Sequence, residues 1–140
     1  MRRIFVAALA LAMMAQVVQA GAAPAFQVGQ KWSIKDSGMQ IVIGRIDPFP
    51  GGKTAVSISL FDMPCPPEAG CTTITLAHVP FDSDALAKSV DRLMGEHQAT
   101  APQFEEGYAT WQLVKGGIYT IPVSQLPQVT FATVLKGQAK

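Results

Sequence analysis

One histidine in this chain has neighbours that suit acid–base chemistry. His78 ends an alternating segment just before a Val-Pro pair, with Asp82 close behind it and Glu105 further along the chain. Histidine changes charge near neutral pH, so a histidine oriented by a carboxylate can act as a general base. No nucleophile motif accompanies these residues, which favours a histidine held by hydrogen bonds at a strand end. His78, Asp82 and Glu105 are the catalytic candidates of the alternative hypothesis, a hydrolase-like enzyme.

The two cysteines of the chain, Cys65 and Cys71, enclose a short segment with two prolines and a glycine. Such turn-forming residues bring sulfur atoms together, and an even pair in an oxidising compartment is typical of a disulfide. A zinc site needs about four ligands, and only His78 and His97 remain to supply nitrogen. A thioredoxin-type redox pair has a shorter spacing. We expect a structural disulfide, no metal site and no cofactor.

Two groups of residues are candidates for binding a partner. The loop between the cysteines is rich in proline and cross-linked, so it loses little entropy on docking. The same features equally suit a loop that only has to resist proteases. The second group belongs to an aromatic stripe at helical spacing, a pattern typical of a core, but its polar tips can reach a ligand at a wet edge. The binding candidates are Pro66, Pro67, Glu68, Tyr108 and Trp111.

Residues 1–22 have the order of a secretory signal peptide. Two arginines precede an apolar run over 4–18, which is followed by small residues. That run is too short for a comfortable membrane span, and no cysteine stands at the cleavage point. We expect cleavage after Ala20 or Ala22, a single mature domain over 23–140 and a periplasmic or secreted location, without membrane insertion.

The charge of the chain is balanced. It has 11 Lys and Arg against 10 Asp and Glu, two of the arginines lie in the leader, and no run of like charge occurs. A nucleic-acid-binding protein has a basic face, and a binder of anionic membranes has a basic amphipathic helix. We therefore set nucleic acid aside and expect a protein or cell-envelope partner.

The first half of the domain alternates apolar and polar residues between turns rich in glycine and proline. This pattern predicts an antiparallel meander of about four strands. The predicted strands cover 26–35, 39–46, 55–61 and 72–79.

The second half begins with helical spacing. A cap at Asp82 or Ser83 starts a predicted helix that ends at Gly95. Its apolar stripe consists of Leu86, Val90, Leu93 and Met94. A capping box at Thr100 starts a second helix, in which Gly107 suits close packing against the sheet. Two closing strands over 118–123 and 128–135 complete a single α+β domain with a twisted, mostly antiparallel sheet.

Several short segments resemble an uncharacterised family of small bacterial proteins. They cover most of the mature chain, and the most distinctive are FEEGY with a following tryptophan and GIYTIPV. The segments are 28–30 with Trp32, 43–46, 57–59, 77–80, 104–108 with Trp111, and 117–123. The resemblance implies one α+β domain and brings no activity to this chain.

The leader, the single domain, the cross-linked loop and the missing catalytic motif favour a small exported binding or inhibitor-like module. The alternatives are the enzyme based on His78 and a structural accessory subunit of an envelope complex.

Overall fold

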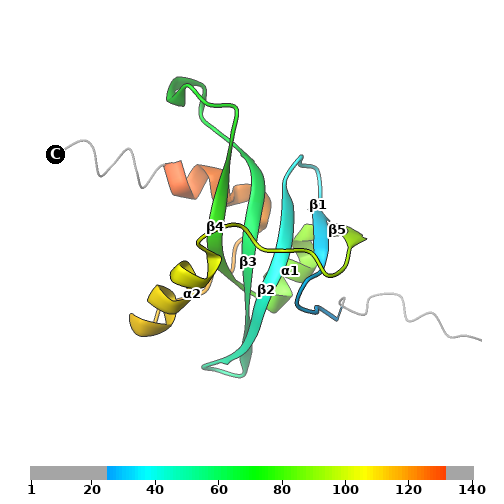
Figure 1. Cartoon of the computed structure of the whole chain (residues 1–140), viewed down its shortest axis with the longest axis vertical. Helices are drawn as coiled ribbons and strands as arrows, with labels where there is room; N and C mark the ends of the chain where they lie inside the picture. Colours follow the sequence, from blue (N-terminus) through cyan, green and yellow to red (C-terminus); the bar gives the residue numbers. More distant parts are fainter. Residues whose placement is uncertain (1–24, 132–140) are drawn as a thin grey trace, which may run out of the picture.

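The computed structural model describes residues 25–131, and over this range the chain forms one sheet of antiparallel strands flanked by helices (Figure 1). The strands are β1 (Lys31–Ile34), β2 (Gln40–Phe49), β3 (Lys53–Pro64), β4 (Thr73–Asp82) and β5 (Val90–Gly95). The helices are α1 (Ser83–Ser89) and α2 (Phe104–Leu113), with short 3-10 helices η1 (Pro67–Ala69) and η2 (Val123–Gln125). A last helical segment begins at residue 126. The predicted α+β class is confirmed.

The sheet has the strand order β4-β3-β2-β1-β5. Its first four strands form the predicted meander, in which short turns join β1 to β2 and β2 to β3, and a longer loop that contains η1 joins β3 to β4. The β2–β3 turn places Gly51 and Gly52 at φ values of 83° and 72°, which favour glycine. A register shift in β2 falls at Gly44, where a Cβ atom would lie 2.3 Å from the Phe104 ring. Gly44 therefore leaves room for α2 to pack closely on the sheet.

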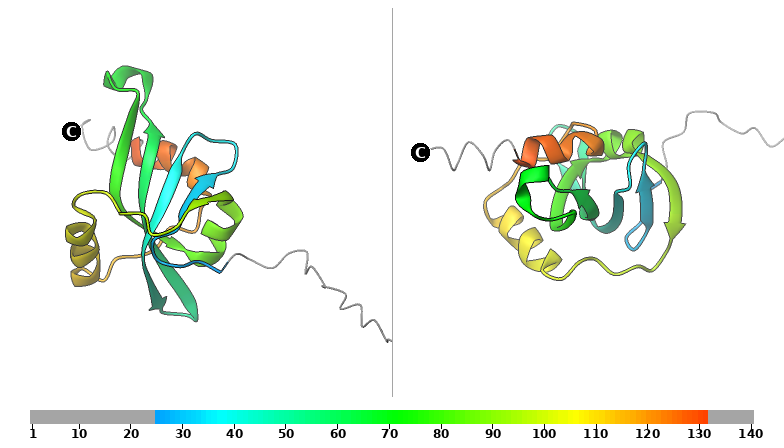
Figure 2. Two further views of the ribbon diagram at one scale, coloured as in Figure 1. Left: turned by 45° about the vertical axis from the view of Figure 1, so that its right-hand side comes forward. Right: turned by 90° about the horizontal axis from the view of Figure 1, so that it is seen from above.

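Helices cover both faces of the sheet, as the view from above shows (Figure 2). Helix α1 and the segment 123–131 lie on one face, and α2 lies on the other. The alternation predicted for β3 separates these two layers, since Val56, Ile58 and Leu60 join the larger core while Ser57 and Ser59 face α2. The larger core also contains Ile41, Ile43, Phe81, Leu86, Val123 and Leu126.

The first predicted helix is wrong in its second half. Asp82 caps α1 as expected, with its carboxylate accepting a hydrogen bond from the Ala85 backbone N–H. The helix ends at Ser89, and the chain continues as β5 along the outer edge of β1. Leu93 and Met94 are consequently exposed and do not continue the apolar stripe. Pairing satisfies the backbone groups of β1, and this long-range gain outweighs the local helical pattern.

The two predicted closing strands are also wrong within the described residues. Only Tyr119 pairs with the sheet, through an isolated parallel bridge to Phe81. Pro122 then precedes η2, and Val123 and Leu126 are buried in the larger core three residues apart. This spacing places both side chains on one face of a helical turn, whereas residues three apart in a strand point to opposite faces. Residues 132–140 of the last predicted strand lie outside the described range.

The second predicted helix exists but begins later. Helix α2 starts at Phe104, after Gln103 with a left-handed φ of 71°, and no side chain caps it. The predicted capping box at Thr100 is therefore wrong. The helix ends at Leu113, before Gly116 and Gly117.

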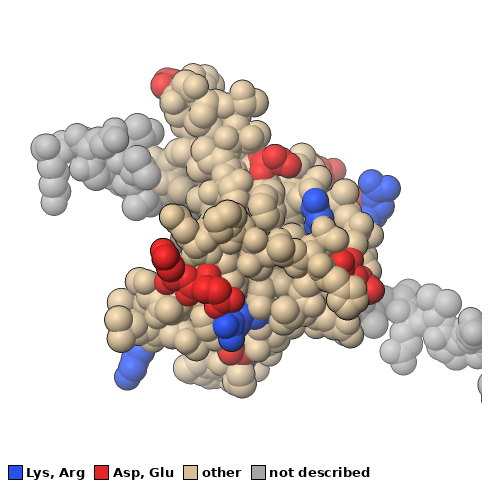
Figure 3. Space-filling view, viewed as in Figure 1, with Lys and Arg blue, Asp and Glu red and all other residues tan. Residues whose placement is uncertain are grey.

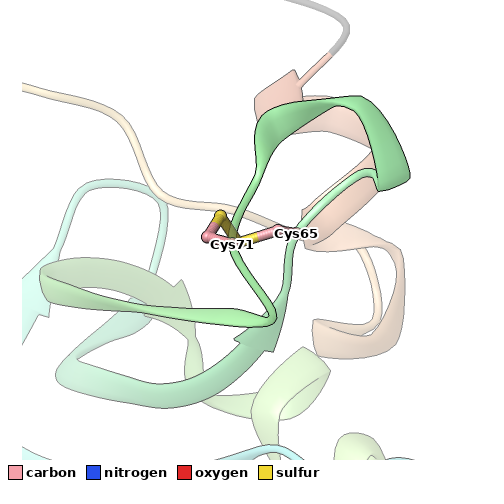
Figure 4. Close-up of a disulfide and its surroundings, with 2 residues drawn as sticks. All are labelled: Cys65 and Cys71. Carbon is pink, nitrogen blue, oxygen red and sulfur yellow. A yellow bond between two sulfur atoms is a disulfide. The ribbon is translucent and has the colours of Figure 1, made fainter.

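The predicted disulfide is confirmed. Cys65 and Cys71 are joined, with their Cα atoms 5.8 Å apart, and they close the loop that connects β3 to β4 (Figure 4). Along residues 25–131, the helices are too short or too polar to span a membrane. The predicted signal peptide lies outside the described residues.

Candidate binding site

An aromatic cluster joins α2 to β4. The ring of His78, on β4, lies 5.5 Å from the ring of Phe104, 5.9 Å from that of Tyr108 and 5.8 Å from that of Trp111, measured between centroids. These three aromatic residues occupy successive turns of α2, so one helix face meets one histidine. Phe104 and Tyr108 are buried, whereas Trp111 is only half-buried. The aromatic stripe is thus buried at Phe104 and Tyr108 and reaches the surface at Trp111.

His78 has a buried serine as its hydrogen-bond partner. Its Nε2 atom lies 2.9 Å from the Ser57 hydroxyl, and Ser57 is fully buried. Burial lowers the pKa of His78, because the imidazolium form would lose hydration. A serine without exposed surface cannot attack a substrate, so this contact serves the packing of α2 in the state described here.

The three catalytic candidates have separate partners. Asp82 caps α1, and Glu105 forms an ion pair with Arg45 at 2.8 Å on the surface. The hydrogen bonds found along residues 25–131 join His78 to neither carboxylate. A catalytic role for His78 with Asp82 or Glu105 stays a prediction.

The hydroxyl of Tyr108 connects α2 to β2. It donates a hydrogen bond to the Asp47 carboxylate at 2.8 Å and accepts one from the Gln112 side chain at 2.8 Å. The guanidinium of Arg45 lies 4.7 Å from the centre of the Tyr108 ring, a cation–π distance. Burial raises the pKa of Tyr108, and the hydrogen bond to Asp47 adds to the rise. Tyr108, a predicted binding residue, is therefore largely occupied within the protein.

Trp111 lies where three surface hollows meet. Its indole ring stacks on Phe49 with a centroid distance of 6.5 Å and an interplanar angle of 17°. The indole N–H donates to the Gly117 carbonyl at 2.9 Å, and Gly116 leaves room for the ring. A Cβ atom at position 116 would lie 2.3 Å from the indole. The orientation of Trp111 is thus set before any ligand arrives.

The first hollow, which we call the Trp111 groove, lies between α2 and the β2–β3 hairpin. It has a volume of about 530 Å³, within the usual range for ligand pockets. Its walls are mostly apolar, with a few polar groups at the rim. The lining residues are 47–50, Trp111, Gln112, Lys115 and Gly116.

Three further hollows lie near the outer edge of β4. One of about 430 Å³ lies between Pro80, Trp111 and the segment 117–119. Another of about 520 Å³ lies over His78, Gly107 and Trp111. A third, which we call the β4 groove, measures about 480 Å³ and lies along the strand. It is lined by 75–80, Gln103, Gly107, Tyr119, Leu126 and Thr130.

The disulfide loop lies at the other end of the molecule. In Figure 1 it projects above the sheet, while α2 lies at the lower left. Pro67 and Glu68 are exposed and Pro66 is half-buried. The structure therefore does not bring these three predicted binding residues together with Tyr108 and Trp111.

Phe49 is the groove residue that sequence reasoning missed. It lies in a Pro-Phe-Pro segment that reads as a turn, because two prolines and two glycines follow one another there. The structure instead extends β2 through Phe49. An aromatic residue between two prolines was the available signal, since proline keeps neighbouring backbone extended.

The face shown in Figure 3 has wide uncharged areas between its red and blue groups. The largest red group, with a blue group beside it, lies over α2, where Glu105 pairs with Arg45. Within residues 25–131, no three His, Cys, Asp or Glu side chains come together as a metal site would require.

Comparisons of the chain with family models, with curated proteins and with solved structures find no match.

Proposed function

We propose that this protein is an exported binding module that holds a protein or cell-envelope partner at the surface around Trp111. The single observation that carries the proposal is the position of Trp111, which lines three adjoining hollows at once. Large aromatic side chains at the centre of such surfaces supply much of the energy of binding.

The surface is already organised in the free protein. Phe49 stacks on Trp111, and the Gly117 carbonyl holds the indole N–H. A partner would therefore meet a rigid apolar wall and would not have to order it, which lowers the entropic cost of binding. Gln112 and Lys115 at the rim add polar groups that can orient the partner.

Export remains part of the proposal. The signal-like segment 1–22 supports it, and the Cys65–Cys71 disulfide fits an oxidising compartment. The disulfide loop offers a second exposed surface, but it lies at the opposite end of the molecule from α2 (Figure 1). Alanine at Pro66, Pro67 and Glu68 is expected to leave partner capture unchanged.

Site-specific cross-linking in cells tests the proposal. A photoreactive amino acid replaces Lys115, an exposed residue of the Trp111 groove, in the full chain expressed with its own leader. The matched control carries the same group at Lys88, which is exposed on α1. One partner cross-linked from position 115, and not from position 88, supports the proposal. Equal products from both positions, or none from position 115, would overturn it.

A further inference from the structure

Strand β4 forms one edge of the sheet. It pairs with β3 on its inner side, and in the described part of the chain no strand lies beyond it. The side chains of Thr73 and Thr75 are exposed there. Edge strands are usually protected by lysine, proline or a covering element, because their free backbone groups accept another strand. Residues 73–79 contain no lysine, proline, arginine, aspartate or glutamate. His78 is the one titratable residue among them.

The chain itself already pairs with this edge at one residue. The Tyr119 N–H donates to the Pro80 carbonyl at 2.9 Å, and the Asp82 N–H donates to the Tyr119 carbonyl at 2.9 Å. This single parallel bridge covers only the last residues of β4. The rest of the edge follows on the same strand, with register shifts against β3 on either side of Leu76, so a second strand would extend an existing pairing.

The β4 groove lies along the strand edge, where an extended chain could pair with β4. Gln103 and Gly107 form its wall on the α2 face, and Leu126 and Thr130 form its wall on the opposite face. The first wall lies at the start of α2 and the second belongs to the last helical segment, so these elements flank the strand edge on both sides. The described lining has no Asp, Glu, Lys or Arg, so it matches an uncharged segment.

We infer that the partner presents an extended, uncharged peptide segment that pairs with residues 73–79 as an added strand of the sheet. This inference rests on the proposed function, because it names the partner's chemistry at the same surface. Backbone hydrogen bonds provide affinity in this mode, and pockets for alternate side chains provide specificity. Trp111, next to the hollow over His78, would contact one end of the bound segment.

A peptide selection tests this inference with a defined probe. The folded, oxidised protein selects binders from a phage library of short linear peptides. The selected peptides are then titrated against Thr75→Pro and Thr75→Val. Proline removes a backbone N–H at the edge, whereas valine keeps it and preserves the shape of threonine. We expect peptides with alternating β-branched residues, whose binding Thr75→Pro weakens at least about tenfold and Thr75→Val leaves unchanged.

Hydrogen exchange on the unaltered protein provides a second measurement, should the proline variant fail to fold. Amides of residues 73–79 are expected to become protected when the peptide binds. Unchanged exchange there, equal binding to both Thr75 variants, or no selected peptide would overturn the inference. If Trp111→Ala abolishes binding while Thr75→Pro has no effect, the inference fails and the proposed function stands. If Thr75→Pro abolishes binding and Trp111→Ala has no effect, strand addition at β4 is supported and the proposed binding surface around Trp111 is rejected.

Discussion

Gly107 lies directly against His78: a Cβ atom at position 107 would come within 2.7 Å of the His78 Cβ atom. Such a contact involves the rigid base of the histidine side chain and not a flexible tip. The approach of α2 to β4 therefore depends on the missing side chain at position 107. The same approach creates the aromatic cluster around His78 and positions Trp111 at the surface.

Gly107→Ala is expected to destabilise the protein. Alanine favours a helix by about 1 kcal/mol over glycine, but relief of the overlap with His78 forces α2 away from the sheet. We expect a net loss of about 1–3 kcal/mol in the free energy of unfolding, measured by urea titration. Gly117→Ala is the control, because a Cβ atom at position 117 would meet no neighbouring atom within 4 Å. A Gly107→Ala protein as stable as the wild type would contradict the packing described here.

The free energy of unfolding should decrease as pH falls below about 6.5, the ordinary pKa of histidine. Burial lowers the pKa of His78 in the folded protein, so the unfolded chain binds more protons in this range. The contribution of neutral His78 to the free energy of unfolding is fully present above that pH. It decreases as the pH falls toward the lower pKa of His78 in the folded protein. Urea titrations of the wild type and of His78→Gln, compared from about pH 7.5 to about pH 5, isolate this contribution. Identical pH profiles would show that His78 titrates normally.

Tyr108→Phe removes the hydroxyl that joins Asp47 to Gln112. Both partners reach solvent, so the expected cost is about 0.5–1.5 kcal/mol in the free energy of unfolding. Gln112→Ala removes only the second hydrogen bond and should cost less. Thermal unfolding of the two variants checks this order. A larger loss for Gln112→Ala would mean that Asp47 contributes little.

Replacing Cys65 and Cys71 together by serine should lower the free energy of unfolding by about 2 kcal/mol, the value that chain entropy gives for so short a ring. Partner capture should not change, because the loop lies at the far end from α2 (Figure 1). Denaturant titration and affinity capture measure the two quantities separately. Loss of capture without unfolding would transfer the binding surface to the loop.

Patterns of neighbouring residues correctly predicted those elements in which the apolar residues are buried as their spacing in the sequence suggests. The alternation of Val56, Ile58 and Leu60 marks β3, and the cap at Asp82 marks the start of α1. The end of α1 depends on β1, which lies far away in the sequence and takes Val90 as a pairing partner of Ile34. No local pattern carries that information, because Leu93 and Met94 have helical spacing in the sequence although they lie in a strand in the structure.

The candidate site was predicted in part for the same reason. Tyr108 and Trp111 were identified from their helical spacing, but the two residues differ in burial in the structure. Tyr108 is buried at 6% exposure with its hydroxyl occupied, while Trp111 reaches the surface. Phe49 belongs to the site only because the β2–β3 hairpin extends past α2. Such a juxtaposition of distant segments follows from the register of the sheet and not from the residues around Phe49.

The measurement that tests the central claim most directly is partner capture by Trp111→Ala compared with Leu113→Ala. Leu113 lies on the same helix and is 84% exposed, but it lines none of the three hollows that Trp111 shares. Both variants are expressed with their own leader, and unfolding curves establish that each is folded. We predict that Trp111→Ala reduces capture at least about tenfold, while Leu113→Ala captures as the wild type does. Equal capture by a folded Trp111→Ala protein would contradict a binding surface centred on Trp111.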